Sequence, residues 1–134
     1  MSGCYLDASA IVKLATAEPE SVALRAWLHG RSPLVTSRIS SVEVARAVGR
    51  KGGGSAARGR AAVREALASV DVTELDAGIA DLAAELGPPT LRAMDAIHLA
   101  SALVLEGEVE IVVTYDARLA DAARAAGLQV AAPA

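Results

Sequence analysis

The sequence has very few aromatic residues and a single cysteine. Phenylalanine is absent, and Tyr5, Trp27 and Tyr115 account for the 2% of aromatic residues in a chain of 134. Base stacking on aromatic side chains is therefore poorly provided for as a way of binding nucleic acid. Because Cys4 stands alone, an internal disulfide and a cysteine-based zinc site are excluded. A lone cysteine suits a reducing cytosol, and we expect a cytoplasmic protein.

A long apolar run is also missing. The first apolar stretch is interrupted by Asp7 and Lys13 and follows no basic segment, so we expect neither a signal peptide nor a membrane span. The net charge of −3 is small and does not mark a nucleic-acid-binding protein by itself. Since 53% of the residues are hydrophobic, there is enough apolar material for one core. We expect a single domain over residues 1–134.

Basic residues are concentrated in one part of the chain. Six of them, and no acidic residue, lie between positions 44 and 64: Arg46, Arg50, Lys51, Arg58, Arg60 and Arg64. A run of three glycines at 52–54 divides this stretch into two predicted helices; it does not follow a strand and is not a phosphate-binding P-loop. The stretch is either a solvated helix pair or a surface for a polyanion. Its candidate contacts for RNA phosphates or for an acidic partner are Arg46, Arg50, Lys51, Arg58 and Arg60.

Short apolar segments alternate with segments of helical periodicity along the whole chain. Strands are predicted at residues 3–6, 33–36, 70–75, 110–114 and 128–131. Helices are predicted at residues 8–17, at 19–28 with Pro19 as the first helical residue, from 37–41 to 51 with Ser37, Ser40 or Ser41 as cap, and at 55–69, 76–86, 91–105 and 117–126. This alternation predicts a parallel sheet covered by helices on both faces.

Four acidic residues lie at the junctions of these elements. Asp7 and Asp116 each follow a predicted strand, whereas Glu43 and Asp95 lie in the early turns of predicted helices. The carboxyl ends of parallel strands meet at one edge of a sheet, where four carboxylates would repel one another unless a cation lay between them. Mg²⁺, or Mn²⁺ as its substitute, is the hard cation that best fits carboxylate oxygens. The sequence therefore predicts a metal site at this edge.

Most of these residues also have a local structural explanation. Asp7 and Asp116 can cap the helices that follow them, with Ser9 and Thr114 as alternative hydroxyl groups. Glu43 can interact favourably with the positive end of the helix macrodipole. Each position taken alone is ambiguous, and it is their common location that favours a functional site.

Asp95 lies on an apolar helix face and needs a partner if it is buried. That partner is a neighbouring backbone group, Arg92 or another base, or a metal ion. His98, three residues later, is interpreted as a hydrogen-bonded core residue and is left outside the chemistry. Asp121 is interpreted as a solvated helix residue, with support of the metal site as the alternative.

Four segments carry a family resemblance: YLDAS at 5–9, SSVEVARA at 40–47, MDAIHLASA at 94–102 and VVTYDARLADAA at 112–123. In this order they resemble PIN-domain ribonucleases, most closely the VapC toxins of bacterial toxin–antitoxin pairs. The resemblance implies a three-layer α/β/α sandwich with a mostly parallel sheet, Mg²⁺- or Mn²⁺-dependent cleavage of RNA, and a VapB-like antitoxin. It also implies a homodimer, which the alanine-rich helices after Asp95 and Asp116 would permit. By position, Asp7, Glu43, Asp95 and Asp116 match the acidic site residues, and Thr114 and Ser9 match supporting hydroxyls.

The chemistry implied is hydrolysis of RNA by a metal-activated water. Asp7, Asp95 and Asp116 would hold one or two ions, and Glu43 would complete the cluster directly or through water. An aspartate-based phosphatase is an alternative, but it would need a second acid two residues after the first, where this chain has Ser9. From a different functional class, a catalytically silent PIN-like binding module is the other alternative.

Overall fold

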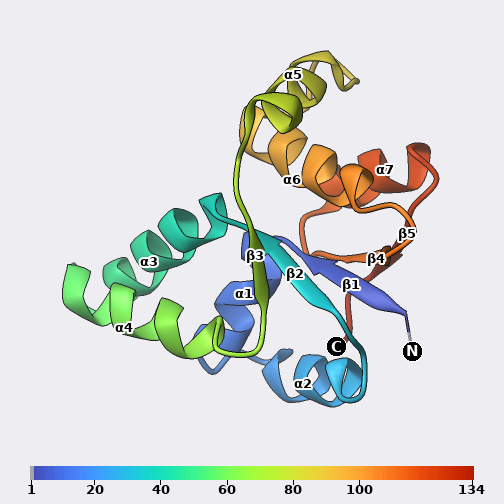
Figure 1. Ribbon diagram of the computed structural model, residues 1–134. Helices are drawn as coiled ribbons and strands as arrows, with labels where there is room; N and C mark the ends of the chain where they lie inside the picture. The colour runs from blue at the N-terminus through green and yellow to red at the C-terminus, as the bar shows by residue number, and fades with distance from the viewer. Residues whose placement is uncertain (1) are drawn as a thin grey trace.

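Five parallel strands form one sheet in the order β3–β2–β1–β4–β5 in the computed structural model, which describes residues 2–134 (Figure 1). The strands are β1 (Gly3–Leu6), β2 (Leu34–Ser37), β3 (Asp71–Thr73), β4 (Val109–Val113) and β5 (Gln129–Ala131). The helices are α1 (Ala8–Ala15), α2 (Ser21–Leu28), α3 (Ile39–Lys51), α4 (Ala56–Ala66), α5 (Ala77–Glu85), α6 (Ala93–Val104) and α7 (Ala117–Ala125). Within residues 2–134, each helix is too short or too polar to cross a membrane.

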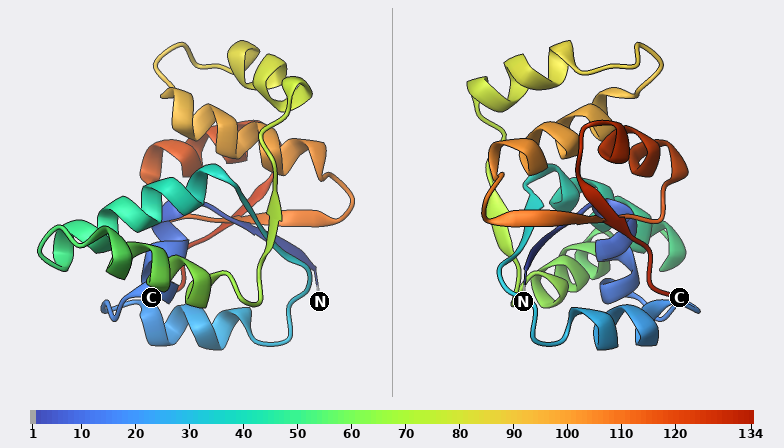
Figure 2. Two further views of the ribbon diagram at one scale, coloured as in Figure 1. Left: turned by 60° about the vertical axis from the view of Figure 1, so that its left-hand side comes forward. Right: turned by 90° about the vertical axis from the view of Figure 1, so that its right-hand side faces the viewer.

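Helices cover both faces of the sheet, so the predicted three-layer α/β/α architecture is confirmed (Figures 1 and 2). Successive residues of a strand point to opposite faces. Cys4 and Leu6 of β1 therefore join the apolar core beneath α1, α2, α3 and α4. Tyr5, between them, joins the second core beneath α6 and α7. The central strand is thus buried on both sides, as its continuous apolar sequence predicts.

Two helices begin where the sequence predicts, each with a capping side chain at its start. Asp76 begins α5 by accepting a hydrogen bond from the backbone N–H of Ile79 at 2.8 Å. Ser55 begins α4 in the same way, with the N–H of Arg58 at 3.2 Å. These contacts join residues three positions apart, so a local sequence pattern is sufficient to predict them.

The predicted start of α2 is wrong, whereas α3 begins within the predicted range of 37–41. Pro19 lies outside α2, because the hydroxyl of Ser21 accepts from the N–H of Glu18 and shapes a turn before the helix begins. Helix α3 begins at Ile39, so Ser40 and Ser41 lie inside it. Of the three predicted serine caps, only Ser37 bonds to this helix start, accepting from the N–H of Ile39 at 3.2 Å.

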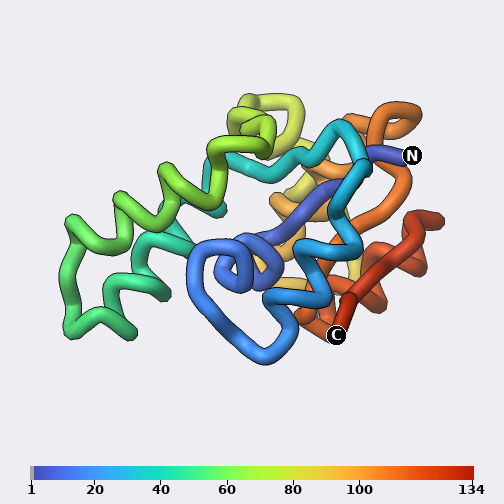
Figure 3. The backbone as a smooth tube through the Cα atoms, turned by 90° about the horizontal axis from the view of Figure 1, so that it is seen from below, coloured from blue at the N-terminus to red at the C-terminus, as the bar shows by residue number. Residues whose placement is uncertain are grey.

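Helices α3 and α4 form an antiparallel pair that projects to one side of the sheet (Figures 2 and 3). The turn between them places Gly53 and Gly54 at φ angles of 75° and 86°, a region that glycine enters without steric cost. The helices approach closely at Gly59, where a Cβ atom would lie 2.2 Å from the carbonyl oxygen of Ala45. This contact fixes the basic stretch of the sequence to one side of the sheet.

We expect Gly59→Ala to destabilise the protein, because the added methyl group overlaps the backbone of α3. Overpacking of this kind typically costs about 1–3 kcal/mol. The matched control is Gly78→Ala in α5, where the nearest atom to a new Cβ is 3.4 Å away and removal of a helical glycine should gain roughly 0.5–1 kcal/mol. Urea unfolding of both variants measures the difference, and a Gly59→Ala variant as stable as wild type would contradict the close approach.

Candidate active site

The candidate site lies where the chain leaves the two adjacent strands β1 and β4. Leu6 and Val113 are paired in the sheet, so Asp7 and Thr114 emerge side by side. Helix α1, which follows β1, and helix α7, which follows β4, cover opposite faces of the sheet. This divergence of neighbouring connections is the arrangement at which open α/β sheets bind ligands. The predicted meeting of Asp7 and Asp116 at one edge of the sheet follows from it.

Asp7 is buried, and each of its carboxylate oxygens is hydrogen-bonded. Oδ1 accepts from the hydroxyl of Ser9 at 2.7 Å and from the backbone N–H of Ala10 at 3.0 Å. Oδ2 accepts from the hydroxyl of Thr114 at 2.6 Å. Burial raises the pKa of Asp7, and the hydrogen bonds from Thr114 and Ser9 oppose this effect. Asp7 therefore caps α1 and at the same time holds a carboxylate at the end of the central strand.

Ser9 and Thr114 do not replace the aspartates as helix caps. The hydroxyl of Ser9 accepts from the N–H of Tyr115 at 2.9 Å while it donates to Asp7. The hydroxyl of Thr114 accepts from the N–H of Asp116 at 3.0 Å while it donates to Asp7. Both hydroxyl groups thus join the residue after β1 to the turn after β4.

Asp116 begins α7 and is only partly buried. Its Oδ1 accepts from the backbone N–H of Arg118 at 2.8 Å and of Leu119 at 3.3 Å, as predicted for a helix cap. Asp121, on the same helix, has a side chain 83% exposed and lies 3.6 Å from Arg124. The interpretation of Asp121 as a solvated helix residue is therefore confirmed.

Asp95 lies in the first turn of α6 and is half-buried. Its pKa is raised first by burial and next by the charge of Asp116; Asp7 and Glu43 add to the increase and His98 opposes it. The four predicted acidic residues thus share one electrostatic environment. Among residues 2–134, neither Arg92 nor any other base forms an ion pair with Asp95.

Glu43 lies in α3, and its carboxylate contacts a residue that sequence reasoning placed elsewhere. Nε2 of His98 is 2.8 Å from Oε1 of Glu43, and Nδ1 of His98 is 2.7 Å from the hydroxyl of Tyr5. His98 is 2% exposed, so the prediction of a hydrogen-bonded core residue is confirmed. Its contact with Glu43 was not predicted from the sequence. The available signal was its spacing of three residues from Asp95, which puts both side chains on one side of α6.

The donor set fits a hard divalent cation. The charges of Asp7, Glu43 and Asp116 all act on Asp95. Within the described part of the chain, none of the four carboxylates is paired with lysine or arginine. Carboxylate oxygens are the ligands that Mg²⁺ and Mn²⁺ prefer. As the side chains stand, no three acidic, histidine or cysteine groups of residues 2–134 surround a single point. Binding an ion would therefore require side-chain rotations.

Arginine side chains continue from the acidic site along α3. A groove of about 480 Å³ is lined by Ser9, Glu43, Arg46 and Arg50. Arg46 and Arg50 also line a second cleft of about 280 Å³ between α3 and α4, to which Arg60 contributes. One face of α3 thus passes from an acidic residue to basic residues at helical spacing.

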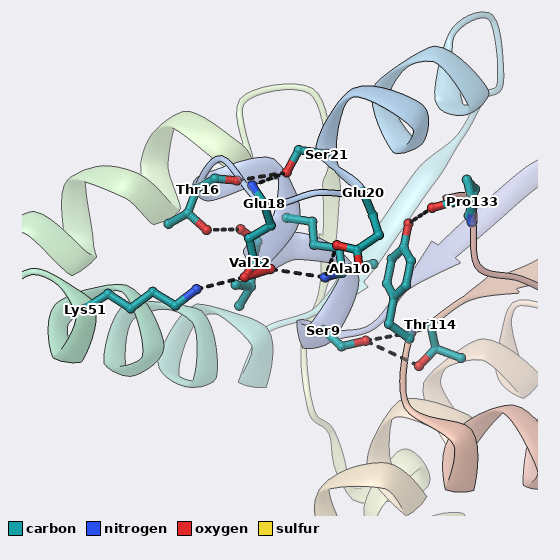
Figure 4. A network of polar contacts seen from close by, with 12 residues as sticks. Ser9, Ala10, Val12, Thr16, Glu18, Glu20, Ser21, Lys51, Thr114 and Pro133 are labelled. Atoms are coloured by element: carbon teal, nitrogen blue, oxygen red, sulfur yellow. Dashed lines mark hydrogen bonds and ion pairs between the residues drawn. The ribbon is translucent and has the colours of Figure 1, made fainter.

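The other two predicted contacts of the basic stretch lie differently. Lys51 forms an ion pair with Glu18 at 2.8 Å, in the turn between α1 and α2 (Figure 4). Arg58 lies beside Gly52, where a Cβ atom would be 2.6 Å from its Cδ. Arg46, Arg50 and Arg60 are therefore the basic residues that line the two cavities.

Known proteins resemble this chain in both sequence and fold. The family model described as PIN domain matches residues 4–125. Ribonuclease VapC46 of Mycobacterium tuberculosis is 47% identical over 133 residues, which cover 99% of each chain. The crystal structure of Mycobacterium tuberculosis VapC20, a sarcin-ricin loop cleaving toxin, has a TM-score of 0.70 at 17% identity and covers 93% of this chain and 95% of that one. A toxin–antitoxin complex from Klebsiella pneumoniae has a chain with a TM-score of 0.67 at 21% identity, covering 98% of both.

We expect Asp95→Asn to stabilise the metal-free protein at neutral pH. The folded-state pKa of Asp95 is raised, so its ionisation opposes folding, and this penalty grows as the pH rises through the carboxyl range. An uncharged amide removes the penalty. Thermal unfolding in EDTA should therefore give a higher melting temperature for the variant at pH 7, with a smaller difference at pH 4. Asp121→Asn on the exposed face of α7 is the matched control, and an equal shift in both variants would exclude the shared field as the cause.

Proposed function

This chain belongs to the PIN-domain family, and from this membership we propose that it is a Mg²⁺- or Mn²⁺-dependent endoribonuclease, the toxin of a toxin–antitoxin pair. A relative named as a ribonuclease supports the activity, since it matches nearly the whole chain at 47% identity. The metal dependence is supported by the common location of Asp7, Asp95, Asp116 and Glu43, none of which is paired with lysine or arginine within residues 2–134. The pKa of Asp95 is raised by burial and then by the charge of Asp116, with smaller effects of Asp7 and Glu43. Carboxylates gathered without a basic partner favour the uptake of a cation.

Each acidic residue has a proposed role. Asp7, Asp95 and Asp116 would hold one or two metal ions, and Glu43 would complete the donor set directly or through water. When bound, a divalent ion supplies a water of lowered pKa and neutralises charge on the phosphate under attack. A nucleophilic side chain is not needed for this reaction.

The surrounding hydroxyl groups keep the first of these carboxylates in place. Ser9 and Thr114 both donate to Asp7, so its oxygens are fixed relative to the turn that carries Asp116. A carboxylate that is buried and held on both oxygens loses little freedom when an ion arrives. Ser9 and Thr114 therefore act as positioning residues in this proposal.

Arg46, Arg50 and Arg60 are the proposed contacts for RNA phosphates. Arg46 and Arg50 line the groove that contains Glu43 and also the cleft that contains Arg60. A single strand lying along α3 would keep its phosphates near these guanidinium groups and present one phosphate to the carboxylates. Contacts of this type position the backbone and do not read base sequence.

The proposed partner is a VapB-like antitoxin, and the proposed oligomer is a homodimer. The solved toxin–antitoxin complex with the same fold supports the first. The homodimer stays a prediction from the family resemblance, and a cytoplasmic location stays a prediction from the single cysteine. Light scattering on the protein alone separates dimer from monomer.

We expect the antitoxin-free protein to cleave RNA at discrete positions in the presence of Mg²⁺ or Mn²⁺. EDTA should abolish cleavage, and Asp7→Asn and Asp116→Asn should reduce the rate by a factor on the order of 100 or more, because a bound ion supplies several kcal/mol of transition-state stabilisation. Gel analysis of a cellular RNA pool, followed by sequencing of the ends, measures both the rate and the target.

Asp121→Asn is the control, because it removes an exposed acid from the same helix as Asp116 and should leave cleavage unchanged. Cleavage that persists in EDTA would contradict metal dependence. Absence of cleavage by folded, antitoxin-free wild type would favour the catalytically silent binding module.

We expect Arg46→Ala and Arg50→Ala each to weaken RNA binding and its dependence on salt. Losing one phosphate contact lowers the slope of log K against log salt by about 0.7 for a single strand. Binding of a short single-stranded RNA to an inactive Asp7→Asn background, titrated at several salt concentrations, gives the slope.

Arg64→Ala is the matched control, since Arg64 is an exposed basic residue of α4 outside both cavities. An equal change of slope for Arg64→Ala would point to a diffuse effect of net charge and against a path along α3.

A further inference from the structure

Three buried or half-buried side chains form a continuous link from the core to the candidate active site. The hydroxyl of Tyr5, on the central strand β1, lies 2.7 Å from Nδ1 of His98 on α6. Nε2 of the same ring lies 2.8 Å from Oε1 of Glu43 on α3. Tyr5 is fully buried and His98 is 2% exposed, so the contact between them is shielded from water, whereas the side chain of Glu43 is 29% exposed. Elements from three distant parts of the chain meet at one imidazole.

The chemistry of the three groups fixes the direction of the hydrogen bonds. A carboxylate only accepts, so Nε2 of His98 must carry the proton that Glu43 receives. In the neutral ring Nδ1 is then an acceptor, and the hydroxyl of Tyr5 is its donor. The rings of Tyr5 and His98 also meet edge to face, with centroids 5.8 Å apart, which further restricts the imidazole. The ring thus has one tautomer and one orientation.

Arg46 and Arg50 are alternative partners for Glu43, and they compete with its hydrogen bond from His98. Arg46 lies three residues further along α3, and both Arg46 and Arg50 line the groove that contains Glu43. Oppositely charged side chains at this spacing attract each other on a helix. Without the donor on His98, the carboxylate of Glu43 would be free to turn toward these guanidinium groups and away from Asp95.

We propose that His98 is a positioning residue: with Tyr5 behind it, it holds the Glu43 carboxylate in the metal-binding group and away from the arginines of α3. This inference rests on the proposed function. It resembles the general case in which residues that hydrogen-bond to a ligating carboxylate tune metal affinity without touching the ion. His98 needs no change of charge in this role.

The experiment is a double-mutant cycle with Mn²⁺ affinity, measured by calorimetry, as the readout. His98→Leu removes the donor and fills the space with apolar atoms, whereas His98→Gln keeps an N–H near the position of Nε2. With Glu43 unchanged, we expect His98→Leu to weaken Mn²⁺ binding about tenfold. We expect His98→Gln to keep most of the wild-type affinity. In a Glu43→Gln background, His98→Leu should have no further effect, because the residue through which it acts has been changed.

A purely structural role gives a different pattern. His98→Leu would then weaken Mn²⁺ binding equally in both backgrounds, and that result would overturn the proposal. Tyr5→Phe is a milder variant that keeps the ring and removes only the hydroxyl; it should weaken Mn²⁺ binding in the same direction as His98→Leu but less. Melting temperatures of all variants identify any loss of folding.

The outcomes separate this inference from the proposed function. Wild type that binds no Mn²⁺ would overturn the metal site and this inference together. Wild type that binds Mn²⁺ with unchanged affinity in His98→Leu would overturn the positioning role alone. Nitrogen NMR of metal-free wild type should show the tautomer of His98 with its proton on Nε2, and a proton on Nδ1 instead would overturn the link independently of any metal.

Discussion

The structure of this site depends on the burial of one carboxylate at the end of the central strand. Asp7 is 3% exposed, and an ionised group so placed is stable only if its oxygens are hydrogen-bonded. Its donors come from its own helix and from Thr114, which is 107 residues away in the chain. Satisfying Asp7 therefore requires β1 and β4 to be neighbours, and the same contact brings Asp116 to the site.

Like charges also repel one another at this site in the folded protein. Asp95 is half-buried among like charges, and within residues 2–134 it forms no ion pair with an arginine. Proteins commonly retain such unfavourable arrangements where a ligand relieves them. The folded state tolerates this repulsion because two apolar cores, one on each face of the sheet, hold the strands beneath the carboxylates.

Helix α3 connects the two kinds of chemistry in the molecule. Its first turns carry Glu43, which the imidazole of His98 holds, and its next turns carry Arg46 and Arg50, which line the adjoining cavities. Glu43 is hydrogen-bonded to the buried imidazole of His98 and, among residues 2–134, forms no ion pair with these arginines. A chain with a small net negative charge can in this way present a basic surface beside an acidic centre.

The sequence by itself determined the features that arise between near neighbours. Alternating apolar segments predicted the parallel sheet, and Asp76 and Asp116 predicted helix starts, because periodicity and capping act over three or four residues. The prediction from sequence was wrong at Pro19, where a side-chain contact of Ser21 overrides the preference of proline for the first helical position. The meeting of Tyr5, Glu43 and His98 was decided only by the tertiary structure. These residues lie 93 and 55 positions apart, and no local pattern specifies which buried groups will share a hydrogen bond once distant elements pack together.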